Sequence, residues 1–276
     1  MHGITFLQAL LLGVTQGLTE FLPISSSGHL VLLQQFFGLR EPVLVFDIFV
    51  HIATLLVVFL IYRREIRTLV AAWLVPSVSV SSLSIHTDTE RAAARRLGIL
   101  LLIANIPTAI IGLGFASTFE KLFAAPWAVG IALLGTGGLL WSLKHRAAGH
   151  REVSQISFGH ALLLGCMQGL AIAPGISRSG STIAIALLCG MPRELAARFS
   201  FLMAIPAILG AALLKGTALR ALSTEQIGLI VTGMLSALVV GYIALRFLLH
   251  LVTQGALWRF AIYCWLVGAG AILISL

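Results

Sequence analysis

The sequence predicts an all-α integral membrane protein built from two inverted-topology repeats, each with one re-entrant helical hairpin and three transmembrane helices. The chain is 59% hydrophobic and only 10% charged over 276 residues, whereas a soluble domain has about 25% charged residues. It contains six apolar stretches of the length that crosses a bilayer. It also repeats one broken apolar segment at a fixed spacing, and these three observations define the fold class.

The repeat lies in residues 10–28, LLLGVTQGLTEFLPISSSG, and residues 162–180, LLLGCMQGLAIAPGISRSG. At an offset of 152 residues, 11 of the 19 positions are identical, where chance would give roughly two or three. Apolar segments interrupted by proline and glycine at corresponding places in two halves indicate a polar site near the bilayer midplane.

Each copy is the centre of a predicted re-entrant hairpin, which covers residues 3–38 in the first half and 157–190 in the second. The breaks fall at residues 22–24 and 173–176, and each apolar arm is too short to cross alone. Irregular backbone at this depth must be buried in protein or face a polar cavity. A single long span kinked by proline is the alternative.

The six full spans follow the hairpins within a single membrane domain. They are residues 44–62, 97–117 and 125–143 in repeat 1 (1–145), and 196–214, 226–247 and 256–275 in repeat 2 (157–276). One hairpin and three spans make an odd number of crossings, so the second repeat is inverted and the two hairpin tips meet near the midplane.

Loop charge is consistent with this inversion. The segments expected on one side, 63–96, 144–156, 190–198 and 246–259, hold 13 of the 18 Lys and Arg residues. The positive-inside rule makes that side cytoplasmic and places both termini outside.

The net charge of +8 does not indicate a nucleic-acid partner, because the basic residues are scattered through short loops. Cys166, Cys189 and Cys264 have neither disulfide-framework nor metal-binding spacing and are expected to be buried apolar residues.

Ionisable residues at membrane depth are the first candidates for function, because a charge there costs at least about 2.5 to 3.5 kcal/mol. They are Glu20, His29, Asp47, His51 and Arg178. Gln16 and Glu20 are four residues apart and share a helical face, so they can hold a common ligand or a cation such as Mg²⁺ or Ca²⁺. Neutralisation of Glu20 by Arg178 is the alternative.

The hairpin tips are expected to bind phosphate. Their hydroxyl residues, Ser25, Ser26, Ser27, Ser177, Ser179 and Thr182, lie where a new helix opens, and exposed N–H groups at a helix start favour anions. Arg178 adds a planar fork suited to phosphate oxygens. His29 is close enough in sequence to activate a serine or a water as a general base. Helix capping is the simpler role for such serines.

The two motifs, Gln16 to Leu30 and Pro174 to Thr182, closely resemble the signature motifs of the bacitracin-resistance type undecaprenyl-diphosphate phosphatases. The length and span layout resemble the family as well. The resemblance implies a hydrolase of the bacterial inner membrane that converts undecaprenyl diphosphate to the monophosphate carrier reused in peptidoglycan synthesis. It also implies dependence on a divalent cation. Many members have Glu at the position of Gln16.

The resemblance further implies that Glu20 is the acidic residue of the first motif and Arg178 the phosphate-gripping arginine of the second. Ser26 and His29 become the candidate nucleophile and base, while direct attack by water activated through His29 or Glu20 is the competing mechanism. Asp47 and His51 receive only supporting roles. We expect the active site to open to the periplasmic face.

A polyprenyl-phosphate transporter that uses the same midplane site is the alternative function, because inverted repeats with broken helices are also typical of transporters. The sequence leaves the oligomeric state open, with a homodimer as one option.

Overall fold

The computed structural model describes residues 4–39, 44–74, 87–215 and 224–275, and in these ranges the chain forms helices and no strand. The elements are α1 (Phe6–Phe21), α2 (Ser26–Phe36), α3 (Leu44–Ile61), α4 (Arg63–Leu74), α5 (Asp88–Gly114), α6 (Ala116–Phe123), α7 (Pro126–Trp141), η1 (Val153–Gln155), α8 (Phe158–Leu170), α9 (Arg178–Leu188), α10 (Arg193–Lys215), α11 (Thr224–Thr253), η3 (Leu257–Arg259) and α12 (Phe260–Ser275).

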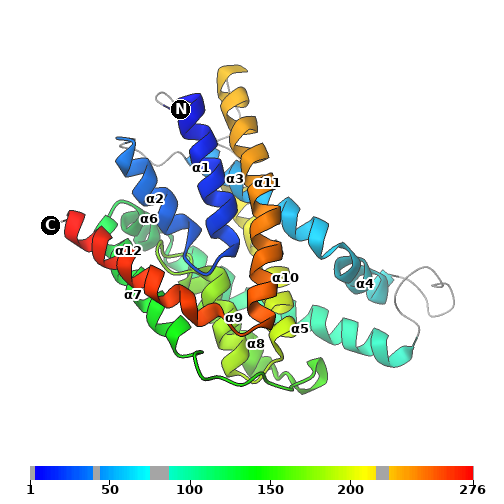
Figure 1. The fold of residues 1–276 in the computed structure, drawn as a ribbon. Coiled ribbons are helices and arrows are strands. Elements are labelled where there is room, and N and C mark those ends of the chain that lie inside the picture. The colour runs from blue at the N-terminus through cyan, green and yellow to red at the C-terminus, as the bar shows by residue number, and fades with distance from the viewer. Residues whose placement is uncertain (1–3, 40–43, 75–86, 216–223, 276) are drawn as a thin grey trace.

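The two predicted hairpins are present. Helices α1 and α2 form the first, and α8 and α9 form the second; Figure 1 shows them entering the molecule from opposite ends. The longest arm, α1, has 16 residues, or about 24 Å at 1.5 Å per residue, against a hydrocarbon layer of about 30 Å. No arm can cross alone, and the chain reverses at each break, so the kinked-span alternative does not apply.

The duplication extends to the way each hairpin begins. Thr5 caps α1 in a reciprocal capping box with Gln8, and Ser157 caps α8 in the same arrangement with His160. These pairs are again 152 residues apart. Each box satisfies N–H groups of the first helical turn that have no partner within the helix, so equivalent residues fix both hairpins at their entrances.

All six predicted spans lie in helices, although not all of these helices are long. Four helical segments, α5, α10, α11 and η3 with α12, are long and apolar enough to cross a membrane. Helices α3 and α7 reach that criterion only together with the bent neighbours α4 and α6, which turn away by 76° and 103°. The described chain therefore has four to six crossing segments.

The segment 63–96, which we expected to be a basic loop, instead contains α4 and the first turns of α5. Helix α4 is amphipathic: Ala71 and Ala72 are buried, α4 packs on α5, and Arg63, Arg64 and Arg67 are exposed. Such a helix lies along a surface rather than crossing it, so hydropathy alone does not identify it. Residues 75–86 of this segment lie outside the described residues.

The packing partners of the two hairpins correspond. Helix α1 packs along α11 and α8 packs along α5, while α7 packs against α12. Equivalent glycines allow both contacts: Gly13 lies on the backbone of Gly233, and Gly165 on the backbone of Ala104. Small residues at helix crossings let backbones approach closely in membrane proteins.

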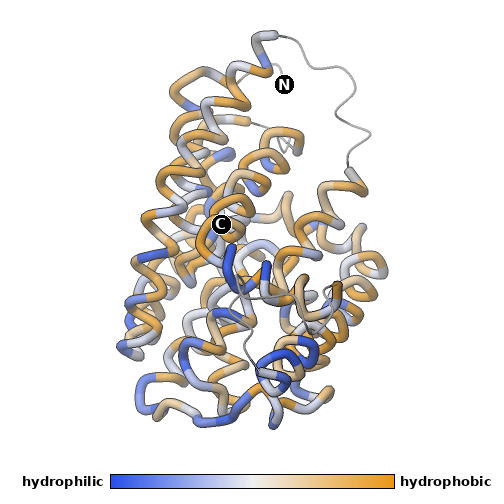
Figure 2. The backbone as a smooth tube through the Cα atoms, turned by 90° about the vertical axis from the view of Figure 1, so that its right-hand side faces the viewer, coloured by the Kyte–Doolittle hydropathy of each residue, from blue (hydrophilic) through white to orange (hydrophobic). Residues whose placement is uncertain are grey.

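The polar ends of the molecule also agree with the inverted arrangement. Figure 2 shows hydrophilic residues gathered at the lower end and an apolar middle. In Figure 1 the loop before α8 and the end of α11 lie at that end, whereas α4 lies at middle height on the right-hand side.

The crossing at Gly165 gives a stability prediction. Gly165→Ala is expected to lower the melting temperature in detergent, because the added Cβ overlaps the Ala104 carbonyl and overpacking costs roughly 1 to 3 kcal/mol. Gly210→Ala in α10 is the matched control, since no atom lies within 4 Å of its added Cβ. The control should be neutral or stabilising; equal melting temperatures for both variants would contradict the close crossing.

Candidate functional site

The two hairpin tips interlock at the centre of the molecule. An added Cβ at Gly28 would meet Gly175 at 3.0 Å, and one at Gly180 would meet Pro23 at 2.9 Å. The backbone N–H of Gly175 donates to Ser25 Oγ at 3.0 Å. Each tip therefore rests on the helix start of the other, and a side chain larger than that of glycine would be crowded at both contacts.

Ser25 marks the tip of the first hairpin by its backbone as well. Its φ of 71° is the only positive value at a residue other than glycine in the described ranges. Strained conformations of this kind cost on the order of 1 to 3 kcal/mol and concentrate at functional sites. The Ser25 hydroxyl also accepts from Gly28 N–H at 3.3 Å, so one side chain caps α2 and joins the two tips.

Glu20 lies at the centre of a cluster of polar side chains. Its Oε1 atom accepts a short hydrogen bond from Arg178 Nη2 in an ion pair. Its Oε2 atom accepts from Ser26 Oγ at 2.6 Å and from Gln16 Nε2 at 3.1 Å. His51 Nε2 lies 3.6 Å from the same oxygen. Four helices, α1, α2, α3 and α9, thus supply side chains to one carboxylate.

The position of Ser26 is suited to nucleophilic chemistry. Its hydroxyl is bonded to a carboxylate, which is a group able to take the proton when the oxygen attacks. Arg178, bonded to the other carboxylate oxygen, carries a permanent positive charge. The structure therefore brings Glu20, Ser26 and Arg178 together, and the ion pair of Glu20 with Arg178 is the alternative that the sequence analysis set beside a functional role.

His29 lies apart from this cluster. Its Nδ1 atom is 2.8 Å from the Ser25 carbonyl, and its Nε2 atom is 2.8 Å from the hydroxyl of Tyr263 in α12. The carbonyl can only accept, so Nδ1 carries a proton; when the ring is neutral, the Tyr263 hydroxyl donates to Nε2. Both ring nitrogens are thereby engaged, and Glu20 has the better geometry to act as base for Ser26.

The remaining hydroxyl groups make hydrogen bonds within and between the two hairpin tips. Ser177 Oγ caps α9 by accepting from Gly180 N–H at 3.1 Å, and Ser179 Oγ donates to the Leu22 carbonyl at 3.4 Å. Thr182 donates to the Arg178 carbonyl at 2.6 Å. Ser27 Oγ lies 3.4 Å from Ser25 Oγ. Phosphate binding by these residues stays a prediction.

Two residues that contact the predicted site residues escaped the sequence analysis, one in the Glu20 cluster and one beside His29. Thr54 accepts from Gln16 Nε2 at 3.5 Å; it follows Asp47 and His51 at helical spacing in α3, and this periodicity could have revealed it. Tyr263 contacts a histidine 234 residues earlier in the chain, and nothing in the apolar sequence of α12 indicates the pairing.

Asp47, which received a supporting role in the sequence analysis, accepts from Gln34 Nε2 at 2.8 Å.

Two buried atoms beside Glu20 have no hydrogen-bond partner in the described residues, Gln16 Oε1 and Arg178 Nη1. The first is an acceptor and the second a donor. An oxygen donor set of amide, carboxylate and hydroxyl suits a hard cation, and a free guanidinium N–H suits a phosphate oxygen. Within the ranges the structure describes, no group of three His, Cys, Asp or Glu residues is arranged to hold a metal.

The fold and the site define a multi-pass α-helical membrane protein whose centre, between two re-entrant hairpins, carries a carboxylate, an arginine and several hydroxyl groups. The chain belongs to the family of the bacitracin resistance protein BacA, whose sequence profile matches residues 9–270.

Similar proteins cover nearly the whole chain. A protein of Desulforapulum autotrophicum named undecaprenyl-diphosphatase is 46% identical over 264 residues, which is 95% of each chain. Proteins with the same name from Desulfatibacillum aliphaticivorans, 43% identical over 96% of each chain, and from Desulfosudis oleivorans, 43% identical over 98% of each chain, are comparably similar.

Proposed function

We propose that the protein is a membrane-embedded hydrolase that removes the terminal phosphate of undecaprenyl diphosphate and releases undecaprenyl phosphate. The observation that carries the proposal is the contact of Ser26 and Arg178 with the two oxygens of one buried carboxylate, Glu20. The names of the relatives support the substrate.

In the proposed reaction, Arg178 binds the diphosphate and balances the charge that builds up on the transferred phosphoryl group. Ser26 Oγ attacks the terminal phosphorus while Glu20 accepts its proton. An oxygen–phosphorus bond to serine forms, the bridging bond breaks, and undecaprenyl phosphate leaves. Water then hydrolyses the phosphoserine and releases inorganic phosphate. Direct attack by a water that gives its proton to Glu20 is the competing route.

Gln16 and Glu20 would hold a divalent cation, Mg²⁺ or Ca²⁺, with the unpartnered Gln16 Oε1 atom as one ligand. Such an ion would neutralise phosphate charge. Because Gln16 is an amide, its contribution is a neutral oxygen rather than a second carboxylate.

Transport of the lipid without hydrolysis is the weaker alternative. A transport site needs to bind phosphate but needs no hydroxyl bonded to a base, and Ser26 and Glu20 form that arrangement at 2.6 Å. The 37–46% identical relatives are named for a diphosphatase.

The orientation belongs to the same proposal. We infer that the basic end is cytoplasmic, that both termini lie outside, and that the lipid diphosphate enters from the periplasmic face of a bacterial inner membrane. The repeats 1–145 and 157–276 then form one inverted pair. The gathering of hydrophilic residues at one end of the molecule supports this orientation (Figure 2). A homodimer is compatible with it and is not required.

The first experiment measures phosphate release from undecaprenyl diphosphate by the purified protein, with and without EDTA. We expect release that EDTA abolishes and that added Mg²⁺ or Ca²⁺ restores. Glu20→Gln, which keeps the shape of the side chain, should lower the rate by at least about a hundredfold. Absence of release from folded protein that still binds the lipid would reject the hydrolase and favour transport. Phosphate release that persists in EDTA would reject the role of the cation but not the hydrolase.

Tyr263 gives a second, smaller prediction. Tyr263→Phe should lower kcat about five- to tenfold with little change in KM, because His29 loses the donor that fixes its ring at the tip. Tyr242→Phe is the matched control, since Tyr242 is 41% exposed against 42% for Tyr263 and lies on α11. Equal activity of both variants would show that His29 needs no partner on α12.

A further inference from the structure

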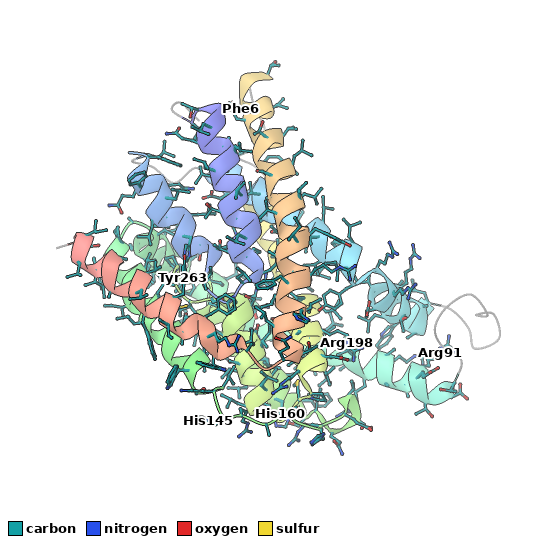
Figure 3. All side chains as sticks on the ribbon, viewed as in Figure 1. Phe6, Arg91, His145, His160, Arg198 and Tyr263 are labelled. Carbon is teal, nitrogen blue, oxygen red and sulfur yellow. The ribbon has the colours of Figure 1, made fainter. Side chains whose placement is uncertain are left out.

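A second charged site lies far from the hairpin tips, at the beginning of α5. A cavity of about 460 Å³ opens there, and the side chains that line it include Asp88, Arg91, Arg95, Arg96, Ile99 and Phe158. Arg91 is labelled in Figure 3 and lies at the right-hand end of α5. Three guanidinium groups face one carboxylate, so the cavity favours an anion.

Two of the arginines, Arg95 and Arg96, are held in position by neutral partners. Arg95 Nε donates to the Ala72 carbonyl of α4 at 2.7 Å. Arg96 donates to the carbonyls of Val153 and Ile156 at 3.1 and 2.7 Å. Backbone carbonyls fix a guanidinium without cancelling its charge. The guanidinium groups of Arg95 and Arg96 each have five N–H donors, more than these bonds use. The site is therefore preorganised and retains positive charge.

The apolar surface next to the cavity indicates what kind of anion it receives. Helix α5 continues from Arg91 and Arg95 into exposed large apolar residues on the same face, at positions 99, 102, 106, 110 and 113. These positions follow the spacing of three and four residues that defines one side of a helix. An acyl chain lying along this stripe would bring its headgroup to the arginines.

The surroundings of the cavity include a tryptophan of the kind found at the level of lipid headgroups. Trp73 of α4 is exposed, and its indole Nε1 lies 3.2 Å from the position of an added Cβ on Gly98, beside the cavity wall. Tryptophan is enriched at the interface between headgroups and hydrocarbon. Basic residues at this level attract anionic lipids.

We propose that this cavity binds the phosphate headgroup of an anionic phospholipid whose acyl chain runs along the exposed face of α5. The site is separate from the hairpin tips and does not depend on the proposed hydrolysis. Arg91, Arg95 and Arg96 bind the phosphate, Asp88 weakens the binding, and the apolar stripe selects a lipid over a soluble anion.

Native mass spectrometry of the full chain with equal amounts of phosphatidylglycerol and phosphatidylcholine tests the proposal. The wild-type protein should retain phosphatidylglycerol at least about fivefold over phosphatidylcholine, and Arg91→Gln should reduce that ratio about fivefold. Asp88→Asn should raise the ratio of retained phosphatidylglycerol to phosphatidylcholine. This variant breaks none of the arginine–carbonyl bonds, so it tests the proposal if Arg91→Gln fails to fold. Arg67→Gln, an exposed arginine of α4 outside the cavity, is the matched control.

Equal retention of the two lipids, or a ratio that moves no more in Arg91→Gln and Asp88→Asn than in Arg67→Gln, would overturn the proposal. Complete displacement of phosphatidylglycerol by millimolar inorganic phosphate would also overturn it, because the site would then bind a free anion. Unchanged phosphate release in the Asp88→Asn variant would confirm that the cavity is independent of the hairpin tips, whereas loss of release would contradict that separation.

Discussion

Arg178→Ala is expected to lower kcat by at least about a thousandfold, because an arginine that compensates transition-state charge in phosphoryl transfer contributes about 10³ to 10⁵. The residue also pairs with Glu20 and leaves one buried N–H group, Nη1, without a partner in the described residues. The measurement is steady-state phosphate release from undecaprenyl diphosphate.

The controls separate loss of chemistry from loss of fold. Arg178→Lys keeps the charge beside Glu20 but loses the planar fork, so we expect an intermediate rate. The alanine variant leaves a buried carboxylate unpaired, which is destabilising, and the double variant Arg178→Ala with Glu20→Gln removes that penalty. Turnover near the wild-type rate by folded Arg178→Ala protein would exclude a catalytic role for Arg178.

Ser26→Ala distinguishes the two proposed routes. If Ser26 Oγ is the nucleophile, the variant should lose several orders of magnitude in kcat, because no other group replaces the missing bond to phosphorus. A rate above about one tenth of the wild type would exclude the covalent route and leave water activated by Glu20. Rapid quenching with a labelled substrate should trap phosphoserine only in the covalent case.

Ser27→Ala is the matched control for that experiment. It removes a hydroxyl of the same turn that contacts Ser25 rather than Glu20. We expect its effect to fall on KM more than on kcat. A loss in Ser27→Ala equal to that in Ser26→Ala would indicate that the turn, and not the nucleophile, was damaged.

The interlocked hairpins and the pairing of Glu20 with Arg178 could be predicted because few sequences tolerate charge at membrane depth. The repeat fixed which two breaks correspond, and the odd number of crossings required them to meet. An isolated charge in that environment requires a partner, and these two residues were the available opposite pair at the tips.

The partner of Ser26 was harder to predict, because proximity in sequence is a poor guide at a helix start. Ser26 is the first residue of α2 and faces Glu20. His29 lies one turn later. Its ring contacts the carbonyl of Ser25 and Tyr263 of α12, and not Ser26. The amphipathic helix α4 was missed for a different reason, since its arginines lower the hydropathy on which the prediction of spans relied.

The bond between Glu20 and Arg178 joins residues 158 positions apart, and this separation constrains how the protein can be made. The first hairpin is synthesised long before its partner arginine exists, and its carboxylate costs at least about 2.5 to 3.5 kcal/mol at the midplane without compensation. Until the second repeat is made, Glu20 can be stabilised by Gln16, Ser26 and His51 of the first repeat, but it lacks the balancing charge of Arg178. The pairing of the two hairpins is therefore expected to come late in biogenesis, and a chain truncated after the first repeat should be less stable in the membrane than the full chain.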